Sequence, residues 1–246
     1  KGGSESVGFE AVGDAYYNKG MDYYMKAADA YASGKISDKV DKIGKEYITA
    51  GKPELAAEVY MKAATEDGYI KAGDLYFKAE DYNNAFTAYE KGNHAEGIKK
   101  FADKLYDDGK ISDGDAQYTK VGEMYAAKSN PDGLKQLAKQ SELRGNYNMA
   151  AGFYEKAGES AKAGTARAMA FLFSLDFEGA KAEYETLGNA DMIKAIHANM
   201  KYLEPLKDVV YYFDEVKKSE PTISYYADTI TKKRTPVKTD VEAYNT

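Results

Sequence analysis

Residues 43–92 read IGKEYITAGKPELAAEVYMKAATEDGYIKAGDLYFKAEDYNNAFTAYEKG and contain one pattern of small and aromatic residues twice. Counted from a leading glycine, a tyrosine follows at position three, an alanine at twelve, a second tyrosine at sixteen and a small residue at nineteen. The two copies are Gly44, Tyr47, Ala56, Tyr60 and Ala63, and then Gly73, Tyr76, Ala85, Tyr89 and Gly92. This spacing predicts a helix, a tight turn and a second helix, used repeatedly.

Outside this stretch, apolar and small residues recur at helical spacing along most of the chain, and no alternating strand pattern persists. Short connections force neighbouring helices to lie antiparallel, so the sequence predicts an all-α fold. Glycines expected to close helices in the left-handed conformation are Gly34, Gly51, Gly109, Gly145 and Gly158. The expected helices span residues 6–19, 21–33, 37–50, 53–65, 68–79, 82–92, 94–108, 112–128, 131–144, 147–157, 159–175, 177–187, 189–202, 205–218 and 220–233.

Weaker copies of the pattern occur further along the chain. One comprises Ala138, Ala150, Tyr154 and Ala157, and another comprises Ala168, Phe171, Ala180 and Tyr184. Val121, Gly122 and Tyr125 match a first helix only. Residues 102–125 also echo residues 28–47, which suggests a duplicated block but conflicts with simple pairing of the helices. The conflict predicts one misplaced helix boundary between residues 93 and 130.

The pattern resembles the tetratricopeptide repeat, with intervals of 29 residues from Gly44 to Gly73 and 30 from Ala138 to Ala168. The resemblance implies a right-handed α-solenoid of about seven antiparallel helix hairpins with a C-terminal capping helix. Residues 1–5 are expected to be disordered or a tag remnant, 6–188 the repeat array, 189–233 capping helices and 234–246 a polar tail.

In that family the first helices of the hairpins line a groove that binds a peptide. The inward positions are one and four after the small residue and three before it. The resemblance therefore implies a partner-binding set of Asp41, Lys45, Ile48, Ile70, Asp74, Phe77, Thr165, Met169 and Leu172. Phe77, Met169 and Leu172 would be the apolar anchors.

Composition restricts the chemistry. The 246 residues include no cysteine, which excludes disulfides and thiolate metal sites, and the net charge of −6 offers no basic face for nucleic acid. No apolar run reaches the roughly 18 residues of a membrane span, so a soluble chain is expected, with a cytoplasmic location favoured. No targeting segment is recognised.

No catalytic residue, metal site or cofactor is expected. His94 and His197 have no partner in helical register, which favours a surface or capping role. Residues 107–115 resemble half of a calcium loop, but that register places Lys104 and Tyr106 at ligand positions. The other carboxylates are expected to be solvated.

Tyrosine is the distinctive residue, with 23 copies, and adjacent pairs such as Tyr16 and Tyr17 cannot both face a helix core. Exposed tyrosines either anchor a partner or reflect composition alone. The sequence predicts a non-enzymatic scaffold that binds a protein or peptide segment. The alternatives are a structural solenoid segment of a larger assembly or longer chain, stacking through its ends by possible self-association, and an enzyme or small-molecule binder.

Overall fold

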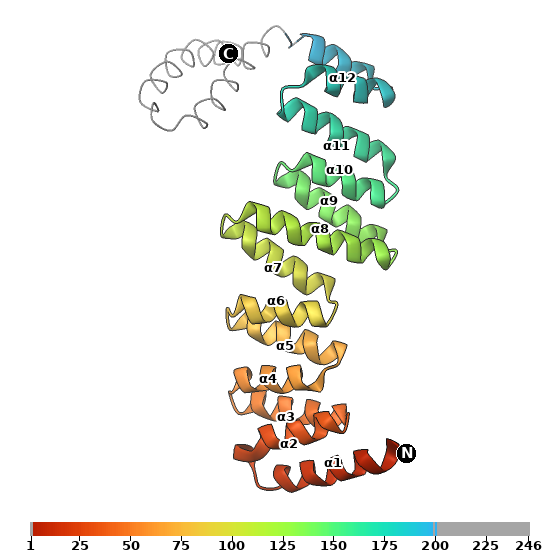
Figure 1. The fold of residues 1–246 in the computed structure, drawn as a ribbon. Helices are drawn as coiled ribbons and strands as arrows, with labels where there is room; N and C mark the ends of the chain where they lie inside the picture. The colour runs from red at the N-terminus through yellow and green to blue at the C-terminus, as the bar shows by residue number, and fades with distance from the viewer. Residues whose placement is uncertain (1, 199, 201–246) are drawn as a thin grey trace, which may run out of the picture. The chain divides into compact units, whose positions relative to one another are not determined.

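The computed structural model describes residues 2–198 and residue 200, and all regular secondary structure in that part is helical (Figure 1). This confirms the all-α prediction. A further helix covers residues 190–198. The preceding elements are α1 (Gly2–Tyr17), η1 (Met21–Tyr23), α2 (Tyr24–Ser33), α3 (Ser37–Thr49), α4 (Pro53–Ala63), α5 (Glu66–Lys78), α6 (Tyr82–Lys91), α7 (Ala95–Asp107), α8 (Ile111–Ala127), α9 (Pro131–Leu143), α10 (Tyr147–Lys156), α11 (Ser160–Phe173) and α12 (Phe177–Thr186).

The helix boundaries agree closely with the predicted ones, with two differences near the N-terminus. The first helix begins at Gly2 rather than at residue 6, and the predicted helix 21–33 is divided into η1 and α2. The expected misplaced boundary between 93 and 130 is wrong, because α7 and α8 lie where their patterns place them. The helices predicted over 205–218 and 220–233, and the polar tail, lie outside the described residues.

The chain divides after Asn130 into two compact units, and the division falls inside the region predicted to be one array. Unit 1 contains α1 to α8, and unit 2 begins at α9. Within each unit, successive helices pack against one another as antiparallel hairpins. The described residues therefore form a solenoid-type stack in each unit.

From α2 to the helix at residues 190–198, every connection contains one residue with a positive φ. In the turn after α3, for example, Gly51 has a φ of 72°, and the next amide, of Lys52, donates to the carbonyl of Tyr47. This bond closes the helix end in the Schellman manner. Glycine takes this position in five of these connections, and Lys35, Ala64, Glu80, Asn93, Ser129 and Leu175 take it in the other six.

Four of the five predicted glycine closures are confirmed, with positive φ at Gly51, Gly109, Gly145 and Gly158. The exception is Gly34, which keeps a right-handed φ of −78° while its neighbour Lys35 adopts a φ of 57°. The reason is packing: a Cβ on Gly34 would lie 2.9 Å from the Cβ of Phe9. This glycine is therefore required by a close contact rather than by the turn.

Tyrosine side chains pack directly on glycines of the paired helix. A Cβ on Gly44 would lie 2.5 Å from the ring of Tyr60, and a Cβ on Gly73 would lie 2.5 Å from the ring of Tyr89. The Tyr89 ring also meets Gly97 of α7, where a Cβ would lie only 2.2 Å away. One buried ring therefore fixes the spacing of α5, α6 and α7.

Two further copies of the pattern become visible in the structure. Ala102, Leu105, Gly114, Tyr118 and Val121 are all buried at the same spacing. Gly13, Tyr16, Ala27, Tyr31 and Gly34 follow it too, with two extra residues that η1 accommodates. The assignment of Val121, Gly122 and Tyr125 to a first helix is wrong, because α8 is the second helix of its hairpin.

The hairpins of unit 1 are thus α1/α2, α3/α4, α5/α6 and α7/α8, and α9/α10 and α11/α12 follow in unit 2. Fully buried alanines such as Ala56, Ala72 and Ala88 lie between the helices, and their small side chains allow the helices to approach one another closely. Within the described residues, no helix combines the length and apolar character needed to cross a bilayer.

Replacing Gly97 by alanine tests the close contact. The new methyl group must displace the Tyr89 ring, so we expect the free energy of unfolding to fall by about 1–3 kcal/mol although alanine favours helix. Gly152 is the matched control, since it lies inside α10 with no atom within 4 Å of an added Cβ. Gly152→Ala should raise stability by about 0.5–1 kcal/mol. Urea denaturation measures both, and equal effects would contradict the contact.

His94 caps α7, since its Nδ1 accepts a hydrogen bond from the amide of Gly97 at 3.2 Å. The predicted capping role is confirmed. Burial lowers the pKa of His94 below its usual value of 6.5, because the charged ring is poorly solvated there. Protonation would also remove the accepting lone pair.

The lowered pKa makes the unfolded chain bind more protons at this residue, so the stability that His94 contributes is present above its unfolded pKa and is lost as the pH falls. His94→Asn keeps an N-cap that does not titrate. We expect the variant to lose less thermal stability than the wild type between about pH 7.5 and about pH 5.5. If the wild type and the variant lost the same thermal stability over this pH range, titration of His94 would not be the cause.

Candidate partner-binding site

The predicted groove residues of α3 lie on the side of unit 1 that the first helices of its hairpins, α1, α3, α5 and α7, form. We call this side the first-helix face. Asp41 is partly buried and forms an ion pair with Lys45 at 2.6 Å. Ile48, one turn further on, is 44% exposed. The structure therefore brings together Asp41 and Lys45, the two charged residues of the predicted set on this helix, and leaves Ile48, the apolar one of that set, open to solvent.

The residues of α5 are placed differently. Asp74 is exposed and accepts hydrogen bonds from the Tyr89 hydroxyl at 2.8 Å and from the Lys100 ammonium at 3.1 Å. Ile70 and Phe77 are partly buried. The Phe77 ring packs edge-on against Tyr82, with centroids 5.2 Å apart. Phe77 therefore contributes to packing within its own hairpin.

The remaining predicted residues lie on α11, in unit 2. Thr165 is exposed and donates to the carbonyl of Ala161, and Met169 is partly buried. Leu172 packs against the cluster formed by Ala168, Phe177, Ala180, Tyr184 and Ile196. The predicted residues of α3 and α5 lie in unit 1, and those of α11 lie in unit 2. The assignment of all nine residues to a binding site stays a prediction.

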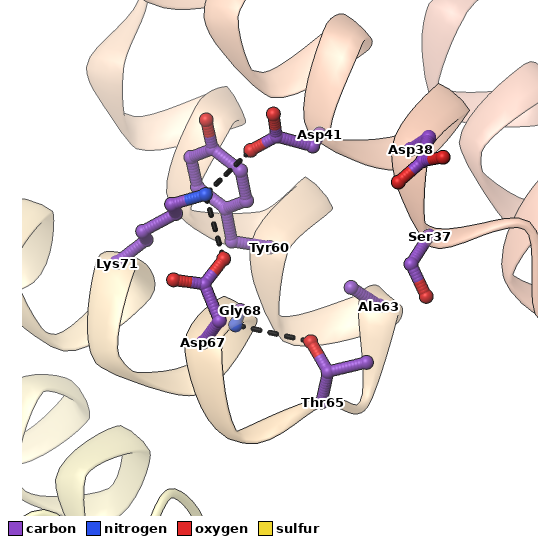
Figure 2. A pocket seen from close by; sticks show the side chains of 9 residues that line it. All are labelled: Ser37, Asp38, Asp41, Tyr60, Ala63, Thr65, Asp67, Gly68 and Lys71. Carbon is purple, nitrogen blue, oxygen red and sulfur yellow. Dashed lines mark hydrogen bonds and ion pairs between the residues drawn. The ribbon is translucent and has the colours of Figure 1, made fainter.

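A hollow of about 170 Å³ lies beside Asp41 in unit 1. Figure 2 shows the Lys71 ammonium lying between two carboxylates, with the ring of Tyr60 beside it. Lys71 binds Asp41 of α3 at 2.7 Å and Asp67 of its own helix at 2.6 Å. The hollow is lined by Ser37, Asp38, Asp41, Tyr60, Ala63, Thr65, Asp67, Gly68 and Lys71.

Local sequence explains how this hollow is built. Thr65 caps α5 by accepting the amide of Gly68 at 3.1 Å. A Cβ on Gly68 would lie 2.7 Å from the carbonyl oxygen of Tyr60, so only glycine allows α5 to begin this close to α4. The start of α5 then presents Asp67 and Lys71 on the same side, one helical turn apart.

The charges of the hollow stabilise one another. Burial alone raises the pKa of Asp41, but hydrogen bonds from Lys45 and Lys71 outweigh it, and the net shift is downward. Hydrogen bonds to Asp41 and Asp67 raise the pKa of Lys71. Burial raises the pKa of Tyr60, which keeps its hydroxyl protonated. The carboxylates of Asp38, Asp41 and Asp67 line the hollow, and two ammonium groups, those of Lys71 and Lys45, pair with them, so the carboxylates outnumber the ammonium groups by one.

A related hollow of about 320 Å³ occurs one hairpin earlier, lined by Asp14, Tyr17, Asn18, Tyr31, Lys39 and Lys42. Asp14 accepts from the Tyr31 hydroxyl and from Lys39, both at 2.6 Å. The Lys39 ammonium lies 5.2 Å from the centre of the Tyr31 ring, as Lys71 lies 5.4 Å from that of Tyr60. Aspartate, tyrosine and lysine thus recur together in successive hairpins.

The lysines link the first helices of neighbouring hairpins. Lys39 joins α3 to α1, Lys71 joins α5 to α3, and Lys100 joins α7 to α5. We call these ion pairs of Asp14, Asp41 and Asp74 the lysine ladder. The expectation that nearly all carboxylates are solvated did not include these interhelical contacts, although the side chains of Asp14 and Asp74 are still 47% and 52% exposed. A sequence signal exists, since Asp14, Asp74 and Asp103 each follow the small residue that opens a copy of the pattern.

The described residues contain no group of three or more histidine, aspartate and glutamate side chains arranged to hold a metal ion. Each hollow is comparable in size to a side chain rather than to a large ligand. The negative charge and aromatic wall of the hollow beside Asp41 suit a cationic side chain.

Comparison with known proteins adds little. No protein-family model matches the sequence, and no curated protein matches it. Among solved structures, a crystal structure of MamA protein matches 74% of this chain and 93% of that chain, with 19% identity and a TM-score of 0.27. A similarity this low supports no transfer of function.

Removing the charge of Asp41 tests the lysine ladder. We expect Asp41→Asn to lower the free energy of unfolding at about pH 7 by about 1 kcal/mol, because Lys71 loses its interhelical partner. The lowered pKa means that this stability is present above the usual Asp value of 3.8 and disappears as the pH falls below it. Urea titrations at about pH 7 and at a pH below 3.8 measure the effect.

Asp67→Asn is the matched control, since Asp67 pairs with the same lysine but is 74% exposed. Asp67→Asn should lower the free energy of unfolding less than Asp41→Asn does, because solvent screens an exposed pair. Equal losses for the two variants would show that the link between α3 and α5 adds no stability.

Proposed function

We propose that this protein is a non-enzymatic interaction scaffold that binds a segment of another protein along the first-helix face of unit 1. The observation that supports it is the recurrence of side-chain-sized, charged hollows at Asp14–Tyr31–Lys39 and Asp41–Tyr60–Lys71. An extended segment can place side chains in such hollows at intervals, as repeat proteins bind along their stacks.

The hollow beside Asp41 favours a segment that carries a lysine or arginine. A partner cation would approach three carboxylates and the wall of Tyr60, and could share Asp41 or Asp67 with Lys71. Ile48, the exposed apolar residue of the same helix, would contact a neighbouring apolar side chain of the partner. Charge then selects the segment, and apolar contact adds affinity.

Exposure decides which predicted residues can test this proposal. Phe77 packs on Tyr82, and Leu172 packs on the core cluster of unit 2, so replacing either by aspartate would also destabilise the fold. Ile48 is exposed and can be changed without opening a cavity. Met169 and Thr165 remain the proposed contacts in unit 2.

The test is selection of peptides from a displayed random library on the full chain, followed by affinity measurement. We expect enriched peptides to contain lysine or arginine, and Ile48→Asp to weaken their binding at least about tenfold. Ile111→Asp is the matched control, because Ile111 is a similarly exposed isoleucine of unit 1, on α8. Failure to enrich peptides, or equal binding by both variants, would overturn the proposal.

The second candidate is a structural solenoid segment that stacks through its ends, by self-association or within a larger assembly. One observation favours it: α1 exposes the large apolar side chains of Val7, Phe9 and Val12, and those of Phe9 and Val12 lie on one side of the helix. Contiguous exposed apolar residues on a helix are typical of interaction surfaces.

A further inference from the structure

The hollow beside Asp41 already contains a cation, which the protein itself supplies. The Lys71 ammonium lies 2.7 Å from an oxygen of Asp41 and 2.6 Å from an oxygen of Asp67, and its nitrogen is 5.4 Å from the centre of the Tyr60 ring (Figure 2). Two carboxylates and the face of an aromatic ring are the contacts that a partner's lysine or arginine would make in this site. Lys71 therefore occupies the position of a bound ligand.

Both oxygens of Asp41 are already bonded. Oδ1 binds Lys71 at 2.7 Å, and Oδ2 binds Lys45 at 2.6 Å. A third cationic group at this carboxylate would be repelled by the two that are there. Of the two lysines, only Lys71 lines the hollow. A cation that enters the hollow can therefore bind Asp41 fully only if Lys71 leaves.

Asp38 offers an incoming cation its first contact. Its carboxylate lines the hollow, is exposed, and forms no ion pair within the described part of the chain. Figure 2 shows it at the start of α3, apart from the Lys71 ammonium. The hollow is open while Lys71 is in place. A partner side chain can therefore enter and pair with Asp38 before it reaches Asp41 and Asp67.

The Lys71 side chain is able to leave. It is 35% exposed, and its ammonium is carried on a flexible four-carbon stem, so it can turn into solvent without opening a cavity in the core. Tyr60 and Gly68, which shape the hollow, are buried and do not have to move.

We propose that Lys71 is an internal competitor, and that a partner's lysine or arginine binds this hollow by displacing the Lys71 ammonium from Asp41 and Asp67. The inference rests on the proposed function and identifies the residue that sets the affinity of that site. Displacement exchanges one cation for another on the same two carboxylates, so a lone cation gains little by it. A segment that also contacts Asp38 and Ile48 gains enough to complete the exchange, which makes the hollow selective.

Displacement also breaks the ion pair between α3 and α5. Lys71 therefore stabilises the free stack and weakens partner binding at the same time, and its removal should have opposite effects on stability and affinity. A residue that only supports the fold would show losses in both, so the two measurements together identify a competitor.

The experiment uses the tightest-binding peptide selected on the wild type, and its counterpart with glutamine in place of the cation. Calorimetric titration measures the affinity of the full chain for both. We expect Lys71→Gln to lower the urea midpoint but to bind the cationic peptide about tenfold more tightly, because Asp67 and one oxygen of Asp41 become free. Affinity for the glutamine peptide should stay the same. Lys71→Arg keeps a competing cation and should bind both peptides as the wild type does.

Lys100→Gln is the matched control, because Lys100 supplies the next ion pair of the lysine ladder, to Asp74, and does not line the hollow. It removes the same charge and should leave both affinities unchanged. Lys71→Gln that binds the cationic peptide no more tightly than the wild type overturns the competitor role. An equal gain for Lys100→Gln, or for the glutamine peptide, overturns it too.

Peptide selection on the wild type and on Lys71→Gln separates this inference from the proposed function. Enrichment on both, with equal affinities, leaves the proposed function standing and overturns the role of Lys71. Cationic peptides enriched only on Lys71→Gln overturn partner binding by the wild type and support the competition. No enrichment on either protein overturns both.

Discussion

The close contact between tyrosine rings and glycines determines how the helices of this protein stack. Tyr89 lies against Gly73 and Gly97 at once, at distances that leave no room for a Cβ, so α6 cannot shift along either neighbour without losing the contact. The alanines around these rings allow the same close approach elsewhere in the stack. Other features of unit 1, including the hollows and the lysine ladder, depend on this spacing, because each connects atoms of helices that the rings hold in position.

The lysine ladder stabilises the face along which we propose that a partner binds. Asp41 and Asp74 occupy positions predicted to contact a partner, and both already bind lysines of the next hairpin. A partner cation would therefore meet a carboxylate that is ionised and positioned before binding, which lowers the cost of ordering the site. The same pairs hold the first helices at fixed intervals, so the proposed recognition would use residues that also stabilise the stack.

Local spacing made the helices and most hairpins predictable, because the rule that places a tyrosine sixteen residues after a glycine acts within one hairpin. The hairpin of α7 and α8 escaped notice because Leu105 and Gly114 replace the usual tyrosine and alanine. The lysine ladder was not predictable from local pattern, since Lys71 and Asp41 are thirty residues apart. The exposure of single side chains was not predictable either. Phe77 and Ile48 hold equivalent positions in the pattern, yet only Phe77 is covered, by Tyr82.

The turns carry a consequence for how such a chain can change length. After α3, the amide of Lys52 must reach the carbonyl of Tyr47, and the same bond recurs from His94 to Tyr89 after α6. Inserting one residue in such a turn would break this bond, and inserting one within the following helix would rotate the residues beyond it by about 100° and aim its tyrosine away from the facing glycine. The stack can therefore gain or lose whole hairpins without losing these contacts, but it cannot gain or lose single residues in these turns.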